Sequence, residues 1–550
     1  MSTHNHELGG QIIRASFAPA AERRSVLDRA HRGDIEGAFG RVPMFDTAPR
    51  ASVARTLATL AAIMGPGLVV MAADEDAGSL SVFAQAGQNY GLRLLWLLLL
   101  LPAALFVNQE MVARLGAVTG AGHARLIFER FGRRWGAFAL GDLLVLNLIT
   151  IVTEFIGVAL ALGYFGVSRY ASVPLAAAAL IAMTATGSFR RWERTMYVLV
   201  AVNFVAIPLM FLSHPSATDA GHALLSGLSG PLGPNKLLFM LALIGTSVSP
   251  WQLFFQQSNV VDKRITPRWL AYERADTLIG TVIFTALAVA ALMTCAFAFR
   301  GTSLRGGFTD AGAVAHGLAT RLGAPAGDLF AIALLNASIL GAGVITLSTS
   351  YAVGDVFGIK HSLHRGWRDA PKFYASFAAC AAIAAGIVLV PSAPLGLVTT
   401  AVQALAGVLL PSASVFLLLL CNDRDVLGPW TNGRFLNAFA TLVVGVLLVL
   451  SALLTVTTLA PGANIAWLAI GLGAALGVLL AILAAYSSSH RRTRSESRAG
   501  RSGWTMPRLE SLPCATRSRA RAFGLTVLRI YIAVAAVLLI VRVVRLSLGA

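Results

Sequence analysis

The chain has 550 residues, of which 56% are hydrophobic and only 13% are charged, and its 44 Lys and Arg outnumber its 26 Asp and Glu. Soluble proteins carry charge on about a quarter of their residues, so the composition excludes a soluble enzyme and favours a protein that crosses a membrane several times. Much of the surplus of +18 lies at the C-terminus, because residues 487–550 hold 12 basic and 2 acidic residues. Such a distribution argues against a nucleic-acid partner.

Twelve apolar segments are long enough to span a bilayer, which takes about 20 helical residues. They lie near residues 56–84, 92–116, 137–165, 172–188, 194–212, 236–259, 276–299, 327–354, 372–390, 396–420, 435–456 and 463–486. A further apolar run, Ile530–Val541, is short for the hydrocarbon thickness and is closed off by arginines, so we expect an interfacial helix rather than a thirteenth span. The predicted parts are a polar cytoplasmic N-terminal tail (1–55), a twelve-helix transporter domain (56–486), a basic cytoplasmic segment (487–521) and a C-terminal hydrophobic helix (522–550).

The charges of the loops predict the orientation. With a cytoplasmic N-terminus, the loops on that side hold 18 of the 24 basic residues between residues 56 and 486, and the opposite loops hold 6. This bias is the positive-inside pattern. It predicts that both tails are cytoplasmic in a multi-pass protein of a bacterial-type inner membrane. The basic segment 487–521 would lie near anionic membrane lipids.

The first span is interrupted by three consecutive acids, Asp74, Glu75 and Asp76, followed by Ala77-Gly78-Ser79. A charged group at mid-bilayer costs about 2.5–3.5 kcal/mol on insertion scales. Successive helical residues point about 100° apart, so the three carboxylates cannot all face one ligand. A helix that unwinds here would offer backbone carbonyls as additional ligands. A misdrawn span boundary is the alternative, but the chain is apolar on both sides.

The sixth span carries a second interruption, Gly245-Thr246-Ser247-Val248-Ser249-Pro250-Trp251-Gln252. Pro250 removes an amide donor and disfavours helical geometry at Ser249, although a proline in a membrane helix can also be a simple kink. Breaks in the first and sixth helices are typical of two inverted five-helix repeats, the LeuT-like arrangement, in which the ion site lies between the breaks. We therefore expect an all-α polytopic membrane fold of this kind. Two further polar groups, Glu154 and Gln403, lie inside the third and tenth spans, where a structural role is the alternative.

These motifs resemble those of the natural-resistance-associated macrophage protein (Nramp) family of divalent metal transporters. In that family Gly-Pro-Gly is followed after eight residues by Asp-Pro-Gly-Asn and, after five more, by Gln-Ala-Gly; here Gly65–Gly67, Asp76–Ser79 and Gln85–Gly87 stand in the same register. The family's Ala-Thr-Val-Met-Pro-His corresponds to the segment that ends at Pro250-Trp251, its Glu-Val-Ile-Gly to Glu154–Gly157, and its Gln eight residues before a Pro to Gln403. The resemblance covers about residues 56–486.

The departures from the family pattern bear on the subclass. The coordinating Asp is kept as Asp76, but Ser79 replaces the Asn, Ser249 replaces the thioether ligand and Trp251 replaces the His. Ile151 stands where an Asp usually precedes Glu154, so the family's usual proton route lacks two of its groups. Loss of the Met makes the chain look closer to the Nramp-related magnesium and aluminium branches.

Coordination chemistry points in the same direction. A thioether selects softer, later transition metals, whereas carboxylate, hydroxyl, carbonyl and water suit Mg²⁺, Mn²⁺ or Ca²⁺. The expected ion ligands are the Asp76 carboxylate, the Ala73 and Thr246 carbonyls, the Ser79 and Ser249 hydroxyls and the Gln403 amide. The expected pathway and gate residues are Glu75, Glu154, Trp251, Gln252 and Gln256. We expect no catalytic residue and no cofactor other than the transported metal ion.

The favoured function is transport of divalent metal cations, with hard ions preferred, by alternating access. The membrane potential supplies about 2.3 kcal/mol per charge per 100 mV, so inward passage needs no coupled ion. A carrier of the same architecture for amino acids or other organic solutes is the first alternative, although three acids at the break would repel a substrate carboxylate. A membrane-embedded enzyme or sensor is the second, but the spans contain no zinc, nucleophile or phosphate-loop motif. A monomer would suffice for transport.

Overall fold

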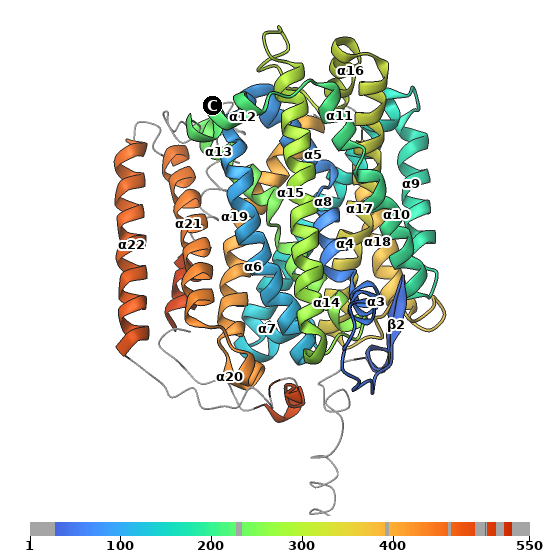
Figure 1. The fold of residues 1–550 in the computed structure, drawn as a ribbon, viewed down its shortest axis with the longest axis vertical. Helices are drawn as coiled ribbons and strands as arrows, with labels where there is room; N and C mark the ends of the chain where they lie inside the picture. Colours follow the sequence, from blue (N-terminus) through green and yellow to red (C-terminus); the bar gives the residue numbers. More distant parts are fainter. Residues whose placement is uncertain are drawn as a thin grey trace, which may run out of the picture.

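The computed structural model describes residues 28–226, 234–390, 395–459, 464–489, 501, 503–512 and 522–530. Figure 1 shows a bundle in which most helices run roughly parallel to one axis, and the N-terminal hairpin lies at the lower end of the bundle. Among the described residues the two short strands of this hairpin are the only strands. Residues 522–530 of the predicted C-terminal helix are helical, and the rest of that prediction lies outside the described residues.

Helices occupy all twelve predicted span positions. In chain order they are α4 (Pro66–Ala73) with α5 (Ala77–Gln85), α6 (Leu95–Thr119), α8 (Arg133–Tyr164), α9 (Arg169–Thr184), α10 (Phe189–Asn203) with α11 (Ala206–Leu212), α13 (Pro234–Ser247) with α14 (Pro250–Asp262), α15 (Leu270–Ala298), α17 (Ala324–Phe357), α18 (Pro371–Val388), α19 (Leu395–Cys421), α21 (Arg434–Leu459) and α22 (Ile465–Ser489). By length and composition, eight stretches of the described residues can cross a membrane, or nine if the bent pair α3–α4 counts as one. The other three positions are α9, the broken pair α13–α14, and α22.

Shorter elements connect these helices. They are α3 (Val53–Ile63), α7 (His123–Phe131), α12 (Ala217–Ser226), α16 (Ala311–Leu322) and α20 (Arg424–Leu427), with single helical turns at Arg29–His31, Ala86–Tyr90, Gly91–Leu94, Pro267–Trp269, Gly428–Trp430 and Leu509–Ser511. The turn at Ala86–Tyr90 is π-helical and continues α5. The first predicted span, residues 56–84, therefore consists of most of α3, then α4, a break and α5, and the π-helical turn lies just beyond it.

The broken helices lie in the middle of the bundle because long apolar helices pack around them. Helix α17 packs along α8, α19 along α13, and α15 along α4. Helices α13 and α19 approach closely at Gly245, where a Cβ atom would overlap the α19 backbone at Gln403 and Gly407. Small residues allow such close approach between membrane helices. The close contact brings α19 and its Gln403 to the break in the sixth span.

The chain before the first span folds onto one end of the bundle. Strands β1 (Ile35–Gly37) and β2 (Gly40–Val42) pair antiparallel, with Ile35 opposite Val42. The hairpin packs on α3, which meets α4 at an angle of 52°. We call residues 28–50 the N-terminal segment. Sequence analysis predicted only a polar tail here.

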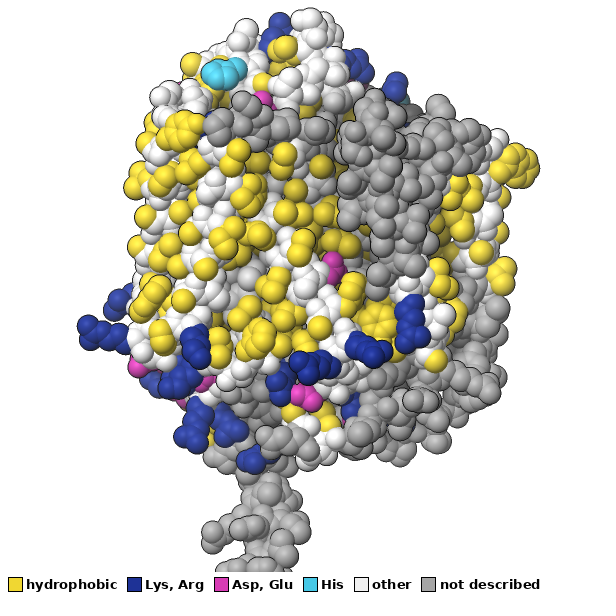
Figure 2. Space-filling model, turned by 180° about the vertical axis from the view of Figure 1, so that it is seen from behind, with side chains coloured by type: hydrophobic (Ala, Val, Ile, Leu, Met, Phe, Trp, Pro, Cys, Tyr) yellow, Lys and Arg dark blue, Asp and Glu magenta, His cyan; other side chains and the backbone are white. Residues whose placement is uncertain are grey.

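Charge is distributed unevenly along the bundle axis. Figure 2 shows apolar side chains over the middle of the described surface and lysines and arginines gathered towards the lower end, the end at which the hairpin lies in Figure 1. Lys and Arg accumulate on the cytoplasmic side of membrane proteins. The surface therefore has the charge pattern that the loop composition predicted.

Candidate functional site

The break in the first span lies between α4 and α5 and leaves a backbone carbonyl without its helical hydrogen-bond donor. Asp76 is the N-cap of α5, and its Oδ1 accepts a hydrogen bond from the Ser79 backbone N–H at 2.7 Å. In an unbroken helix the Ala77 N–H would donate to the Ala73 carbonyl. It donates instead to Glu154 Oε2 of α8, at 3.0 Å. The Ala73 carbonyl has thereby lost its helical donor, as a metal ligand requires.

The break in the sixth span frees a second carbonyl by a different route. Ser249 has extended backbone angles (φ −99°, ψ 146°), and Pro250 starts α14. Because proline has no N–H, the Thr246 carbonyl receives no helical donor from residue 250. This carbonyl accepts from the Ser79 hydroxyl at 3.2 Å, and the Thr246 hydroxyl donates to Ser79 Oγ at 2.8 Å. The two breaks are therefore in direct contact.

The remaining predicted ligands lie at the same place or next to it. A Cβ atom on Gly78 would overlap the Gln403 amide nitrogen, so the α19 side chain lies directly against the start of α5. Gln403 is buried, and its Nε2 has no hydrogen-bond partner in the described part of the chain. The Ser249 hydroxyl donates to the Gly245 carbonyl at 2.5 Å. Rotation of the Ser249 side chain about its Cα–Cβ bond would turn this oxygen away from Gly245 and make it available to an ion.

Four carboxyl groups lie buried at or beside the first break. Asp74 accepts from the Gln252 amide, which accepts in turn from Gln109 Nε2 at 2.8 Å. Neither oxygen of Glu75 has a partner among the residues that the structure describes. Within those residues no Lys, Arg or His forms an ion pair with Asp74, Glu75, Asp76 or Glu154. Buried carboxylates without a counter-charge are expensive in an apolar medium, and a metal cation would supply that charge.

The predicted gate residues are also buried. Trp251 is 1% exposed, packs edge-on against Phe255 and accepts a hydrogen bond on its carbonyl from Ser348 at 3.0 Å. Gln256 Nε2 donates to the Thr277 hydroxyl of α15 at 2.9 Å. The path from the breaks along α14 is therefore closed in this conformation. Gln257 lies on another face of α14, where it contacts His123 at 2.8 Å.

Sequence reasoning missed the groups that hold the start of α4, at the end of the bundle where the N-terminal segment lies. Asp276 of α15 accepts three backbone N–H groups at the start of α4, from Gly65 at 3.0 Å, Gly67 at 2.7 Å and Leu68 at 3.1 Å. A helix start leaves such N–H groups without internal partners. Pro66 marked a helix start, but its acceptor lies about 210 residues away. The available indication was that Asp276 is an acid at the first residue of a predicted span.

Lys263, directly after α14, was missed for the same reason. Its ammonium donates to the Met64 carbonyl and to Glu193 Oε1 of α10, both at 2.5 Å. The side chains of Lys263 and Glu193 are 0% and 1% exposed. One buried ion pair thus ties the fifth and sixth spans to the residues that precede α4.

The N-terminal segment covers this end of the broken helices. Arg365 donates to Asp28, with Nη2 2.6 Å from Oδ1, and the Ala38 N–H donates to Glu193 Oε2 at 2.5 Å. Burial raises the pKa of Asp28, but the hydrogen bonds from Arg365 and from backbone N–H groups outweigh it and lower the pKa to about 2. Burial lowers the pKa of His31 to about 4. Burial also disfavours protonated His361, but the Asp355 carboxylate raises its pKa to about 9.

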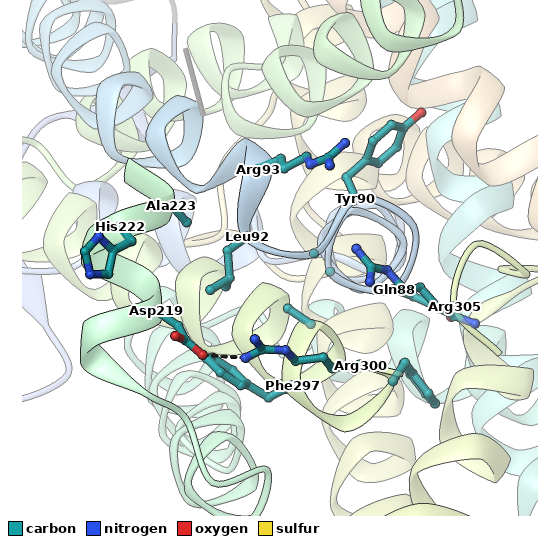
Figure 3. Close-up of a pocket in the computed structure, with 14 residues that line it drawn as sticks. Gln88, Tyr90, Leu92, Arg93, Asp219, His222, Ala223, Phe297, Arg300 and Arg305 are labelled. Carbon is teal, nitrogen blue, oxygen red and sulfur yellow. Dashed lines mark hydrogen bonds and ion pairs between the residues drawn. The ribbon is translucent and has the colours of Figure 1, made fainter. Parts of the chain in front are cut away.

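A separate cavity of about 290 Å³ lies at the opposite end of the bundle (Figure 3). Its lining includes Arg93, Arg300 and Arg305, and Arg300 is paired with Asp219 of α12. Three guanidinium groups against one carboxylate repel a divalent cation. We therefore do not assign this cavity to the ion path.

Comparisons with known proteins agree with the geometry. The family description "Natural resistance-associated macrophage protein-like" matches residues 67–457. A divalent metal cation transporter, MntH, of Verminephrobacter eiseniae is 29% identical over 416 residues, which are 72% of this chain and 89% of the relative, and one of Burkholderia ambifaria is 27% identical over 440 residues, 76% and 93%. The crystal structure of a manganese transporter from Eremococcus coleocola superposes with a TM-score of 0.61 at 19% identity, covering 79% of this chain and 96% of that one, which shows a shared fold. The chain therefore belongs to the Nramp family.

Proposed function

We propose that this protein carries hard divalent cations, Mg²⁺ and Mn²⁺ among them, across a cytoplasmic membrane by alternating access of its broken helices. The observation that carries the proposal is the set of buried carboxyl groups at the first break, for which the described chain offers no positive partner. Relatives named as divalent metal cation transporters support the class of substrate. As a member of the Nramp family the protein is a transporter rather than an enzyme.

The preference for hard ions rests on the ligands at the two breaks. Asp76, Ser79, Ser249 and Gln403 offer oxygen ligands, as do the carbonyls of Ala73 and Thr246. A methionine also lies in α4, but the sulfur of Met71 faces α15, where it lies 3.9 Å from the Thr281 hydroxyl. Mg²⁺ keeps several of its waters when bound. Replacing the family thioether by the small Ser249 leaves room for such a partly hydrated ion.

The same geometry disfavours an organic-acid substrate. Carriers of this architecture bind a substrate carboxylate with the free N–H groups at the start of a half-helix. At the start of α5 the Ala77 N–H is bound to Glu154 and the Ser79 N–H to Asp76. The helix start that would receive the carboxylate is therefore occupied by two carboxylates.

The charge distribution supports a cytoplasmic N-terminus, because the lysines and arginines gather at the end that the N-terminal segment covers. Transport as a uniporter is energetically sufficient, since the membrane potential acts on both charges of the ion. Ile151 and Trp251 stand where the family carries proton-route residues, which favours uncoupled transport. We also propose that the protein works as a monomer and uses no cofactor.

The test is ion flux into liposomes that contain the purified protein. We expect uptake of Mg²⁺ and Mn²⁺ without acidification of the lumen, and weaker uptake of Cd²⁺. Asp76→Ala should abolish uptake. Asp328→Asn should not, because this α17 carboxyl accepts a hydrogen bond from the Tyr164 hydroxyl of α8 at 3.0 Å and belongs to neither break. Absence of flux for every divalent ion would refute the function. A preference for Cd²⁺ over Mg²⁺ would refute the hard-ion site.

A further inference from the structure

A second set of buried charges lies at the cytoplasmic ends of α10, α14 and α15, apart from the candidate ion site. Glu193, Glu273, Asp276 and Lys263 are all 0% exposed. Lys263 pairs with Glu193, and Asp276 binds the start of α4. Glu273 forms no ion pair in the described ranges, and its Oε2 has no hydrogen-bond partner there. The cluster therefore contains three carboxyl groups and one ammonium, two more acidic groups than basic ones.

A polar stripe of α14 connects this cluster to the first break. Gln252, Gln256, Asn259 and Lys263 are spaced by four, three and four residues, which places them on one face of the helix. Gln252 holds Asp74 at one end, and Lys263 contacts the Met64 carbonyl at the other. At a rise of about 1.5 Å per residue the stripe is about 16 Å long. It therefore follows the closed path from the ion site to the cytoplasmic end of the bundle.

Several oxygens of the stripe lack partners, although their side chains are fully buried. The amide oxygens of Gln256 and Asn259 have none among the described residues, and neither does the amide nitrogen of Asn259. Gln256 Nε2 is 3.4 Å from Glu273 Oε1, so this amide and the carboxyl lie side by side. Asn259 follows one turn later on the same face. Buried polar groups are normally paired, and each exception asks for a ligand such as water or an ion.

The oxygens offered here suit a particular class of ligand. A carboxylate with two amide oxygens is the kind of donor set that binds Mg²⁺, Mn²⁺ or Ca²⁺. We propose that Glu273, with Gln256 and Asn259, forms a second station for a hard divalent cation. An ion that leaves Asp76 pauses at this station before it reaches the cytoplasm. The proposal rests on the proposed function, because it needs a cation that travels along α14.

The neighbouring Lys263 ammonium limits how tightly this station binds a cation. Lys263 lies four residues, about 6 Å along the helix, beyond Asn259. Its positive charge weakens cation binding at Glu273 while Glu193 partly offsets that charge. An ion is therefore held loosely, which is what release requires.

The experiment measures Mn²⁺ binding to the purified full-length protein by electron paramagnetic resonance and Mg²⁺ uptake in liposomes. We expect two Mn²⁺ per wild-type chain, one in Asp76→Ala, one in Glu273→Gln, and none in the double variant. We also expect Glu273→Gln to lower the maximal uptake rate at least fivefold with KM changed less than twofold. The matched control is Glu129→Gln, a surface carboxyl on α7 that pairs with Arg125 at 2.7 Å and should leave both readouts at wild-type values.

Two outcomes separate this proposal from the proposed function. If the wild type takes up no divalent ion, the function itself is refuted. If the wild type transports normally but Asp76→Ala binds no Mn²⁺ and Glu273→Gln keeps the full uptake rate, only the second station is refuted. Should Glu273→Gln fail to fold, Asn259→Leu provides the same test, because it removes a neutral ligand and a loss of the second Mn²⁺ is again expected.

Discussion

Replacing Lys263 with Met should open the end of the bundle that the N-terminal segment covers. The Lys263 ammonium lies 2.5 Å from Glu193, and the two side chains are 0% and 1% exposed. Removing one partner of a buried ion pair leaves an uncompensated charge and costs about 3–5 kcal/mol. This cost falls on the closed conformation, in which Glu193 is kept from water. Each 1.4 kcal/mol is a factor of ten in an equilibrium constant, so the open form should gain about a hundredfold or more.

The opening can be measured by thiol labelling of a single reporter. Thr277 is 0% exposed, and its backbone would be overlapped by a Cβ atom on Gly67 of α4, so it becomes reachable only when α4 moves away. In a Cys514→Ser background, Thr277→Cys should react about a hundredfold faster with a membrane-impermeant maleimide when Lys263→Met is added. Replacing both partners, Lys263→Met with Glu193→Leu, removes the unpaired charge and should bring the rate back to within about threefold of the parent.

The control and the refuting results follow from the same physics. Arg274→Met removes an ion pair with Glu110 in which the arginine is 42% exposed, and Glu110 keeps its ion pair with Arg114 at 3.2 Å, so no carboxylate is left uncompensated. Its labelling rate should therefore change less than fivefold. If the double variant reacts as fast as Lys263→Met, the uncompensated charge is not the cause. If Lys263→Met alone leaves labelling unchanged, the ion pair does not hold the closed form.

Three further predictions test other parts of the structure. Ser249→Met should raise the ratio of Cd²⁺ to Mg²⁺ uptake at least tenfold in competition, because a thioether favours softer ions; an unchanged ratio would mean that residue 249 does not face the ion. Gly78→Ala should slow transport more than tenfold, because its Cβ would overlap the Gln403 amide, whereas Gly221→Ala on α12 has open space and should be silent; equal rates would contradict the packing of α19 on α5. Docking of the N-terminal segment should weaken as the pH falls from 6.5 towards 4, because burial lowers the pKa of His31 to about 4 in the docked segment, so that the undocked segment takes up a proton which the docked one does not. Protection factors of the amides of residues 28–46 in the full-length protein, taken from hydrogen exchange corrected for the intrinsic pH dependence of amide exchange, should fall between pH 6.5 and 4.5, and protection factors that stay constant over this range would contradict this.

The two breaks could be predicted because each violates a local rule of membrane helices. Pro250 lacks an amide donor, and the carboxylates at residues 74–76 are costly in a bilayer, whatever surrounds them. Hydrophobic length and loop charge likewise depend on neighbouring residues only. The positions of the twelve helices therefore followed from the sequence, as did Asp76, Thr246 and Gln403 as neighbours in space, the last through its resemblance to the family.

The start of the first span was predicted less well. The segment 56–84 was interpreted as one span, but the chain bends by 52° between α3 and α4. Gly65 has φ +153°, a backbone conformation that is open to glycine and rarely to other residues, and Pro66 begins the new helix. Gly-Pro-Gly was therefore a boundary rather than part of a continuous helix. The role of Asp276 at this boundary depends on contacts across about 210 residues, which one sequence cannot reveal.

The N-terminal segment shows the same limit for a different reason. Its residues are polar and make one short hairpin, so neither periodicity nor hydrophobic length distinguishes them from a free tail. Their structure comes from partners elsewhere in the chain: Arg365 for Asp28, Glu193 for the Ala38 N–H, and Arg264, which donates to the Ala30 carbonyl at 2.9 Å. Arg264 and Arg365, which sequence analysis interprets as part of the positive-inside pattern, thus also hold this segment in place.

The backbone and side-chain groups of the candidate ion site differ in how they can respond to an ion. The Ala73 and Thr246 carbonyls are freed by the backbone itself, one because Glu154 takes the Ala77 N–H and one because Pro250 has none. Neither carbonyl gains or loses a proton, so their contribution does not change with pH. The Asp76 carboxylate, in contrast, accepts the Ser79 backbone N–H, and the Ser79 hydroxyl is hydrogen-bonded to Thr246. An ion bound here as proposed would exchange these hydrogen bonds for ion contacts. Because Ser79 lies on α5 and Thr246 on α13, this exchange would couple occupancy of the site to the relative position of the two half-helices.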